Sequence, residues 1–264
     1  MRTHLKTKPQ KVTDHSSGCH GLDGGEVHKV LGNGYVLNIR PAPSEMEALC
    51  FVDVLDTSGH ALFELNEFAI GLHDATGKDI DGDSHPDLVI EATTGGHCCF
   101  TYAILSLTPP KILARIRNEY PIDFSEKAGK IVLTTRDGAF DYFQGFYSAS
   151  PRADVFLRFE GGGLRDASSD FREEYDRQIA EARAKLTQPV LDRFRASTSV
   201  PGPAEIHAVV LTVVLEYLYS GRDQQAWQAL ADMWPPANLE HTRKMITDAK
   251  ARGILAPIIH PAPP

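Results

Sequence analysis

The chain has 264 residues, 42% of them hydrophobic, with 35 acidic and 27 basic side chains and a formal net charge of −8 at pH 7. This composition predicts a globular protein with a substantial core, in one large domain or two smaller ones. The acidic balance argues against a nucleic-acid partner, and the longest apolar run, residues 208–215, is much shorter than the roughly eighteen residues of a membrane span.

The first part of the chain, residues 1–25, is expected to be a flexible lead. It carries Ser16-Ser17-Gly18 and Gly24-Gly25 and shows little hydrophobic periodicity. Its first twenty residues are polar and basic and lack the apolar stretch of a secretory signal. Any expectation of export must therefore come from other features of the chain.

Short apolar runs separated by turn residues occupy the next part of the chain, a pattern typical of β-strands. The turn Asp56-Thr57-Ser58-Gly59 predicts a hairpin between two of them. We expect an all-β domain over residues 26–164, built of antiparallel sheets resembling propeller blades or of a sandwich, and too short for a closed ring. The predicted strands are 35–39, 48–55, 61–65, 88–92, 100–107, 112–116, 131–135 and 155–159.

A weak internal repeat runs through this region. Residues 86–95 can be laid over residues 129–138, an offset of 43 residues, which lies in the range of one propeller blade. Lys127 and Lys130 stand where the second copy would need acids, so that copy should bind no calcium. Chance similarity between two segments with a turn followed by a strand is the alternative.

Helical spacing replaces the strand pattern after Gly161-Gly162-Gly163, which we interpret as a linker between domains. Residues 165–255 are expected to form a small all-α domain, a bundle or a helical repeat, followed by a Pro-rich tail at 256–264. The predicted helices cover about 175–194 with a break at Thr187 to Pro189, 204–219, 223–233 capped by Asp223, and 238–253 capped by Asn238.

An acidic loop precedes the strand predicted at 88–92. Asp79, Asp81, Asp83 and Asp87 occupy positions 1, 3, 5 and 9 of this loop, and only Lys78 adjoins them to offset their charge. Hard cations such as Ca²⁺ take six to eight oxygen ligands, so acids at every second residue can converge on one ion. The spacing predicts one structural Ca²⁺ site, with a solvated acidic turn as the alternative.

The segment 79–88 resembles the calcium loop of FG-GAP repeats, found in integrin-type propellers and in bacterial proteins with VCBS repeats. Ser84 stands where that family usually has Gly, at a position that often needs positive φ. Ile90 occupies the place of the bidentate Glu of an EF-hand, which argues against a helix-loop-helix motif. The resemblance implies that His85 contributes only its backbone carbonyl, and it gives the metal ligands as Asp79, Asp81, Asp83, His85 and Asp87.

The match extends to Gly95-Gly96-His97-Cys98-Cys99-Phe100, which is similar to an exported bacterial subset of the same family. This resemblance implies β architecture, calcium binding and export, but it implies no reaction. We therefore expect a periplasmic or secreted protein whose signal peptide is absent from the sequence, with a cytoplasmic location as the alternative.

The four cysteines, an even number, suit an oxidising compartment. We favour disulfides in which Cys50 pairs with Cys98 or Cys99 and Cys19 pairs with the other. Three alternatives stay open: a bridge between Cys98 and Cys99, a soft-metal site that uses His97 with a thiolate, and a catalytic cysteine.

Function is less clear from the sequence than fold. We expect calcium-stabilised binding or scaffolding with no clear catalytic site and an unknown protein or glycan as partner. A secreted hydrolase acting on a polymer, with its site near His73 and His97, is the first alternative, and a peptide-docking module on the helical domain is the second. The most credible binding surface beside the calcium loop is an aromatic cluster around Gly145, formed by Phe140, Tyr142, Phe143, Phe146 and Tyr147.

Overall fold

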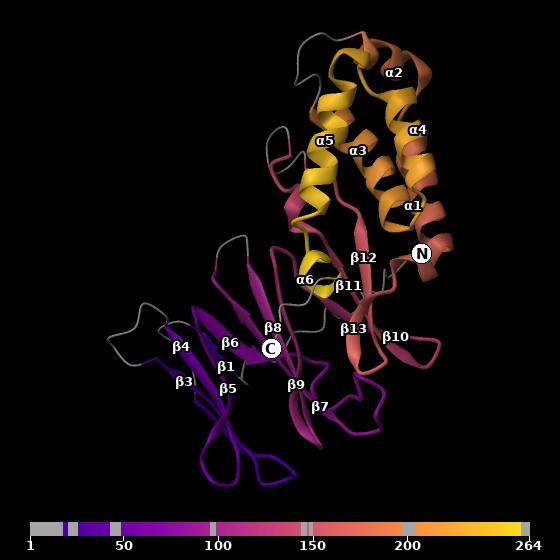
Figure 1. The fold of residues 1–264 in the computed structure, drawn as a ribbon. Coiled ribbons are helices and arrows are strands. Elements are labelled where there is room, and N and C mark those ends of the chain that lie inside the picture. Colours follow the sequence, from indigo (N-terminus) through magenta and orange to yellow (C-terminus); the bar gives the residue numbers. More distant parts are fainter. Residues whose placement is uncertain are drawn as a thin grey trace, which may run out of the picture. The chain divides into compact units, whose positions relative to one another are not determined.

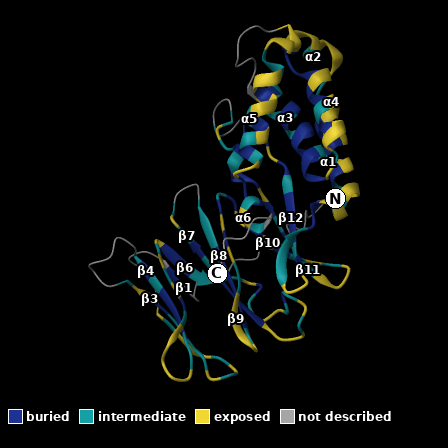
Figure 2. Ribbon diagram, viewed as in Figure 1, coloured by how far each residue is buried: buried dark blue, intermediate teal, exposed yellow. Residues whose placement is uncertain are grey.

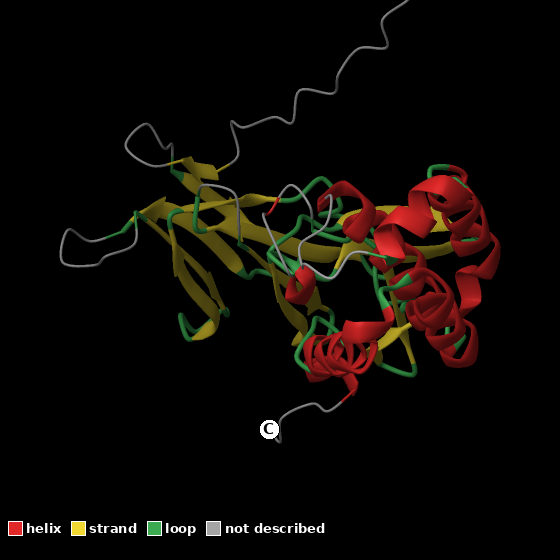
Figure 3. Cartoon of the chain, turned by 90° about the horizontal axis from the view of Figure 1, so that it is seen from above, coloured by secondary structure: helices red, strands yellow, loops and turns green. Residues whose placement is uncertain are grey.

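The computed structural model describes residues 18–20, 26–42, 49–95, 99–143, 147, 150–196 and 204–259. Strands come first along the chain and helices follow, as the sequence colours of Figure 1 show, and Figure 3 distinguishes the helices from the strands. The strands form open sheets, each with a linear strand order. The predicted fold class, antiparallel sheets followed by a helical region, is therefore confirmed.

The first sheet has four strands in the order β2-β3-β4-β5, with each neighbouring pair antiparallel. Asp56 begins the predicted hairpin turn between β4 and β5, where the Gly59 amide donates to its carbonyl at 3.0 Å. The strands are β2 (Val27–Val30), β3 (Val36–Pro41), β4 (Cys50–Leu55) and β5 (Ala61–Glu67).

The second sheet has five strands in the order β1-β6-β7-β8-β9. Its first strand lies within the predicted flexible lead and pairs with β6, with Cys19 opposite Ile70. The acidic loop joins β6 to β7. The strands are β1 (Gly18–His20), β6 (Ala69–Leu72), β7 (Asp87–Thr93), β8 (Phe100–Leu107) and β9 (Pro110–Asn118).

These two sheets share one buried core. Because residues two apart on a strand point to the same face, each strand contributes alternate apolar side chains. The core includes Leu37 and Ile39 of β3, Val52 and Val54 of β4, Phe63 of β5, Ile70 of β6, Leu88 and Ile90 of β7, and Ala103 and Leu105 of β8.

A disulfide between Cys19 and Cys50 joins β1 to β4, with their Cα atoms 5.8 Å apart. The predicted pairing of these two cysteines with Cys98 and Cys99 is therefore wrong. The reason is strand β1, which the sequence did not predict and which carries Cys19 into the core beside β4. Cys99 is also disulfide-bonded, and Cys98 lies outside the described residues.

The third sheet has the order β10-β11-β12-β13 and is antiparallel throughout. Glu160 pairs with Gly163, and Gly161 and Gly162 both have positive φ, of 63° and 83°. The glycines interpreted as a domain linker therefore form the turn of the hairpin β12–β13. The strands are β10 (Asp123–Lys127), β11 (Lys130–Arg136), β12 (Asp154–Glu160) and β13 (Gly163–Asp166).

The helical region is organised around α3, which packs against α1 and α4 and also contacts β12. Figure 2 shows α3 buried along most of its length, whereas α1 and α4 expose their outer faces. The helices are α1 (Arg172–Ala184), α2 (Gln188–Arg195), α3 (Ala204–Tyr219), α4 (Asp223–Met233), α5 (Leu239–Lys250) and the short α6 (Ala256–Ile259).

The chain forms two compact units. The first comprises Met1–Lys78, His85–Gly96 and Thr101–Arg115, and the second comprises Asp79–Ser84, His97–Phe100 and Ile116–Pro264. The third sheet thus belongs to the same unit as the helices, although the predicted boundary at 164 follows the change from strand to helix. The domain bounds 26–164 and 165–255 stay a prediction.

The two segments of the 43-residue repeat fall on equivalent strands. Residues 86–95 contain β7 and residues 129–138 contain β11. Each of these strands is the second in a run of four consecutive strands, β6 to β9 and β10 to β13. This equivalence favours true repetition of a four-stranded unit over chance similarity.

Candidate metal centre

The acidic loop is closed at its base by backbone hydrogen bonds. The Gly77 amide donates to the Asp87 carbonyl, and the Asp87 amide donates to the Lys78 carbonyl, both at 2.8 Å. The turn before the loop is fixed to β7 by Thr76, whose hydroxyl oxygen donates to the Val89 carbonyl at 3.0 Å and accepts from the Val89 amide at 3.1 Å. The first residues of β7 therefore hold both ends of the loop.

Carboxylates within the loop fold it back on itself. Asp79 accepts from the amides of Gly82 at 2.7 Å and Ser84 at 2.9 Å, and Asp81 accepts from the Asp83 amide at 3.2 Å. Such side-chain bonds to nearby amides are the usual way in which Asp stabilises a turn. The path requires positive φ at Gly82 (84°) and Ser84 (70°), so the predicted departure from the family pattern does place a serine in the left-handed region.

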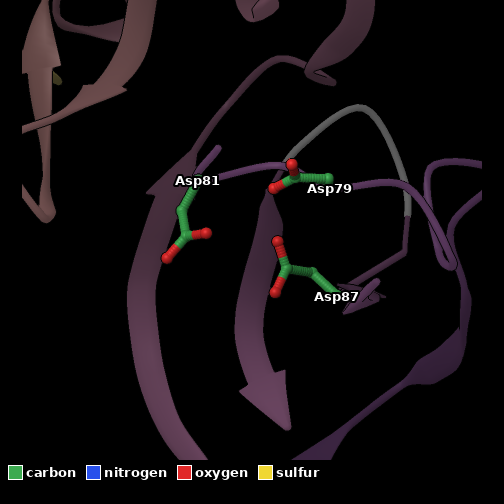
Figure 4. Close-up of side chains that lie close together, drawn as sticks. All are labelled: Asp79, Asp81 and Asp87. Atoms are coloured by element: carbon green, nitrogen blue, oxygen red, sulfur yellow. The ribbon is translucent and has the colours of Figure 1, made fainter. Parts of the chain in front are cut away.

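Three of the predicted ligands converge. Side-chain oxygens of Asp79, Asp81 and Asp87 all lie within 4.8 Å of one another, and Figure 4 shows the three carboxylates facing a common point. Asp87 is buried, with 2% of its surface exposed, and the other two are half-buried. Asp83 and His85 are not members of this group, and the carbonyl ligand expected from His85 stays a prediction.

The geometry of the triad suits a hard divalent cation. Carboxylates this close repel one another, and an ion among them would offset that repulsion. Calcium binds oxygens at about 2.3–2.6 Å, so two oxygens on opposite sides of one ion are about 4.6–5.2 Å apart. The spread of the triad, at most 4.8 Å, fits inside such a coordination sphere.

His73, expected to line a hydrolase site, lies in the first unit beside Glu91 and Tyr102. Its Nδ1 accepts from the Ala75 amide at 3.1 Å, which leaves Nε2 as the protonated nitrogen, 3.9 Å from Glu91 Oε2. Its ring meets Tyr102 edge-on at 5.9 Å. His97 lies outside the described residues, so the pairing of the two histidines in one site stays a prediction.

The aromatic cluster divides between core and surface. Phe140 is 1% exposed at the end of a 3-10 helix (Gly138–Phe140), whereas Tyr142 is 68% exposed. Tyr142 lies in the turn that follows this helix and has a φ of 57°. The Tyr142 and Tyr147 rings lie 5.6 Å apart, and Phe146 is outside the described residues.

One functional candidate was missed from the sequence. Glu216 lies in α3 with 1% of its surface exposed, and burial together with the nearby Asp154 and Glu174 raises its pKa to about 9. The signal was a lone acid in an otherwise apolar stretch, Val213-Val214-Leu215-Glu216. Its partners could not be identified in the sequence because they come from β11, β12 and α1.

Comparison of the chain with protein-family models, with curated proteins and with solved structures gives no match. The resemblance of the acidic loop to FG-GAP repeats therefore rests on the motif residues alone. Among the described residues, no helix is both long and apolar enough to cross a membrane.

Proposed function

We propose that this protein is a calcium-stabilised extracytoplasmic binding or scaffolding protein, with one structural Ca²⁺ held in the loop from Asp79 to Asp87. The observation that carries the proposal is the convergence of three carboxylates, contributed by positions 1, 3 and 9 of that loop. The remaining ligands would be backbone carbonyls and water, which complete calcium sites in many proteins.

The position of the loop couples the ion to folding. Asp87 is the first residue of β7, and the next residues of that strand, Leu88 and Ile90, are fully buried in the core. An ion that fixes Asp87 relative to Asp79 restrains the entry of this strand. A ligand that binds only the native state stabilises it by about 2.7 kcal/mol at one hundred times its dissociation constant.

Two features support the proposed extracytoplasmic location. The Cys19–Cys50 disulfide favours an oxidising compartment. The triad, with one buried and two half-buried carboxylates, also suits the weaker calcium sites of extracellular modules, which bind in the range of roughly 10⁻⁴–10⁻³ M. Both features are compatible with a periplasmic or secreted protein.

The binding role is supported by the exposed tyrosine pair. Tyr142 is 68% exposed and packs on Tyr147, leaving an aromatic surface open to solvent. Exposed rings stack on sugars and on peptide groups, so a glycan or a protein segment is the expected partner. Among the described residues, the exposed large apolar side chains are Val30, Phe68, Ile112 and Tyr142; none lies in a helix, so peptide docking on the helices gains no support.

Calcium titration after chelation tests the metal site. We expect CaCl₂ to raise the thermal midpoint in a saturable way, and Asp81→Ala to abolish the rise because it removes one of three converging carboxylates. Asp74→Ala is the matched control, since Asp74 is an exposed acid in the turn before the loop and lies outside the triad. An unchanged midpoint in the wild-type chain would rule out the structural calcium.

A further inference from the structure

A cavity of about 290 Å³ lies in the second unit between the third sheet and helices α1 and α3. Polar and charged side chains from four elements line it, and they are separated by as many as 80 residues in the sequence. They include Arg136 of β11, Arg152 just before β12, Asp154 as the first residue of β12, Gln178 of α1, Lys185 at the C-terminal cap of α1, and Glu216 of α3.

Glu216 is the least usual member of this lining. It is 1% exposed, and its Oε2 has no hydrogen-bond partner among the described residues. Burial and the neighbouring Asp154 and Glu174 outweigh Arg136 and Arg222 and raise its pKa to about 9, so it holds a proton at neutral pH. A buried polar group left without a partner destabilises the native state, and a ligand oxygen that accepts a hydrogen bond from the Glu216 carboxyl group would remove that penalty.

The other two acids that line the cavity, Asp154 and Glu181, already have partners. Asp154 Oδ1 lies 3.7 Å from Arg136 Nε, and its Oδ2 accepts from Gln178 Nε2 at 2.8 Å. Glu181, also in the lining, accepts from Arg177 at 2.7 Å. These contacts neutralise the negative charge around the cavity and fix the side chains that carry it.

Two cations of the cavity are not neutralised in this way. Neither Arg152 nor Lys185 forms an ion pair with a carboxylate in the part of the chain that the structure describes. The Arg152 guanidinium instead lies 5.7 Å from the centre of the Tyr147 ring. Arg152 also interacts electrostatically with Asp141, which does not line the cavity. With Glu216 neutral, the lining holds three cations, Arg136, Arg152 and Lys185, against the two acids Asp154 and Glu181, a surplus of one positive charge.

We propose that this cavity binds a small organic carboxylate, whose oxygens pair with Arg152 and Lys185 and accept a hydrogen bond from the Glu216 carboxyl group. An arginine guanidinium offers paired donors that match a carboxylate, and a protonated acid is the partner that a carboxylate oxygen accepts from. Two cations at the opening favour a ligand with two carboxylates over one with a single group. A diamine is not expected to bind, because pairing with its ammonium groups would require Glu216 to lose its proton.

Binding of succinate and acetate tests this proposal, measured by calorimetry on the full chain at fixed calcium and at constant ionic strength in potassium chloride. We expect saturable binding of succinate, about tenfold tighter than acetate. Arg152→Ala, Lys185→Ala and Glu216→Leu should each weaken the binding of succinate at least about fivefold. Glu216→Gln keeps a hydrogen-bond donor and should weaken the binding less. Lys244→Ala is the matched control, because this exposed lysine of α5 pairs with Asp248 and does not line the cavity.

Circular dichroism and tryptophan fluorescence establish that each variant is folded before its affinity is compared. If Glu216→Leu fails to fold, the two cation variants carry the test. Binding of succinate no stronger than chloride, preferential binding of putrescine, or an equal loss of affinity in Lys244→Ala would each overturn the proposal. None of these results depends on calcium bound at the acidic loop, so failure of this proposal and failure of the structural calcium site are distinguishable.

Discussion

Ser84 is the residue at which the acidic loop departs most from an ideal turn. Its φ of 70° places a side chain in the left-handed region, where residues other than glycine are strained by roughly 1 kcal/mol. A Cβ added at the neighbouring left-handed residue, Gly82, would meet no other part of the chain within 4 Å, so substitution there introduces backbone strain alone. The two positions thus form a matched pair for testing how backbone strain affects the loop.

Ser84→Gly should stabilise the loop, and Gly82→Ala should destabilise it. We expect the first change to raise calcium affinity a few-fold and stability by about 0.5 kcal/mol, part of the relieved strain being lost to the greater freedom of the unfolded chain. Gly82→Ala should lower calcium affinity and stability by a similar or larger amount. Calcium titrations monitored by thermal midpoint measure both; weaker calcium binding by Ser84→Gly would show that the serine side chain itself supports the site.

Glu216 makes the stability of the second unit depend on pH. Its native pKa of about 9 lies above the ordinary value of 4.5, so between these limits the native state holds a proton that the unfolded chain has released. Stability due to this residue is therefore present below about pH 4.5 and falls as the pH rises toward 9, by about 3 kcal/mol at pH 7.

Glu216→Gln should remove this dependence, since an amide does not titrate in this range. We expect the variant to be more stable than the wild type at pH 8, and to lose less stability between pH 5 and pH 9. Urea unfolding followed by tryptophan fluorescence at several pH values measures the difference. Parallel plots of unfolding free energy against pH for the two proteins would mean that Glu216 is ionised in the native state.

At the scale of elements, strands of six or more residues with clear apolar alternation or a continuous apolar run were predictable, and strands of three to five residues were not. The run at 100–107 became β8 with the same bounds, and the hairpin turn at Asp56 was also correct. The strands missed were β1, β2, β6, β10 and β13, which have three to five residues each. Most of β2 is exposed at a sheet edge, so burial imposes no alternation on its sequence.

Helix ends were predicted well where glycine or proline sets them. The helix expected at 204–219 is α3, followed by Gly221 with a φ of 73°, and the break expected between Thr187 and Pro189 separates α1 from α2. Asp223 was expected as a cap but is the first residue of α4, while the capping position is Arg222. The Gly161 to Gly163 segment was misread because a glycine-rich hairpin turn and a flexible linker have the same composition.

His207 joins three helical segments through ring contacts. It is 4% exposed in α3, and its ring centre lies 4.8 Å from that of Phe194 at the end of α2 and 5.1 Å from that of Trp234 after α4. Burial lowers its pKa below the ordinary 6.5, so the unfolded chain takes up a proton more readily than the native one. The stability that comes from burying His207 in its neutral form is thus present above about pH 6.5 and is lost as the pH falls below this value.

Acidification should therefore loosen this helix junction. We expect the thermal transition monitored by tryptophan fluorescence to move to lower temperature between pH 7 and pH 5, and His207→Leu to reduce that movement while keeping the site apolar. The slope of the thermal midpoint against pH isolates the effect of the histidine. The absolute midpoint does not, because the substitution also changes packing. Equal slopes in both proteins would show that other groups cause the acid sensitivity.

At the scale of the whole molecule, a site could be predicted when its residues lie close together in the sequence. The metal triad could be found because its three acids lie within nine consecutive positions, 79–87, and one loop brings them together. Asp83 lies outside the convergent group, and spacing alone does not show which carboxylates of a loop turn inward. The Glu216 cavity could not be found, because it depends on packing α1 and α3 against β11 and β12.

The two compact units should also respond differently to loss of the disulfide. Cys19 and Cys50 lie in the core of the first unit, whereas both tryptophans, Trp227 and Trp234, lie in the second. Removing a crosslink that spans 31 residues destabilises the native state by about 3–4 kcal/mol in the chain-entropy account. The double substitution Cys19→Ala and Cys50→Ala should therefore lower the stability of the first unit by an amount of this order.

Two probes applied to the same samples separate the responses. Far-ultraviolet circular dichroism near the β-sheet band should show an earlier transition in the double variant, while tryptophan fluorescence should report an unchanged midpoint. This outcome requires that the units unfold separately, as domains with their own cores commonly do. If the fluorescence midpoint falls together with the dichroism midpoint, the two units unfold as one cooperative structure.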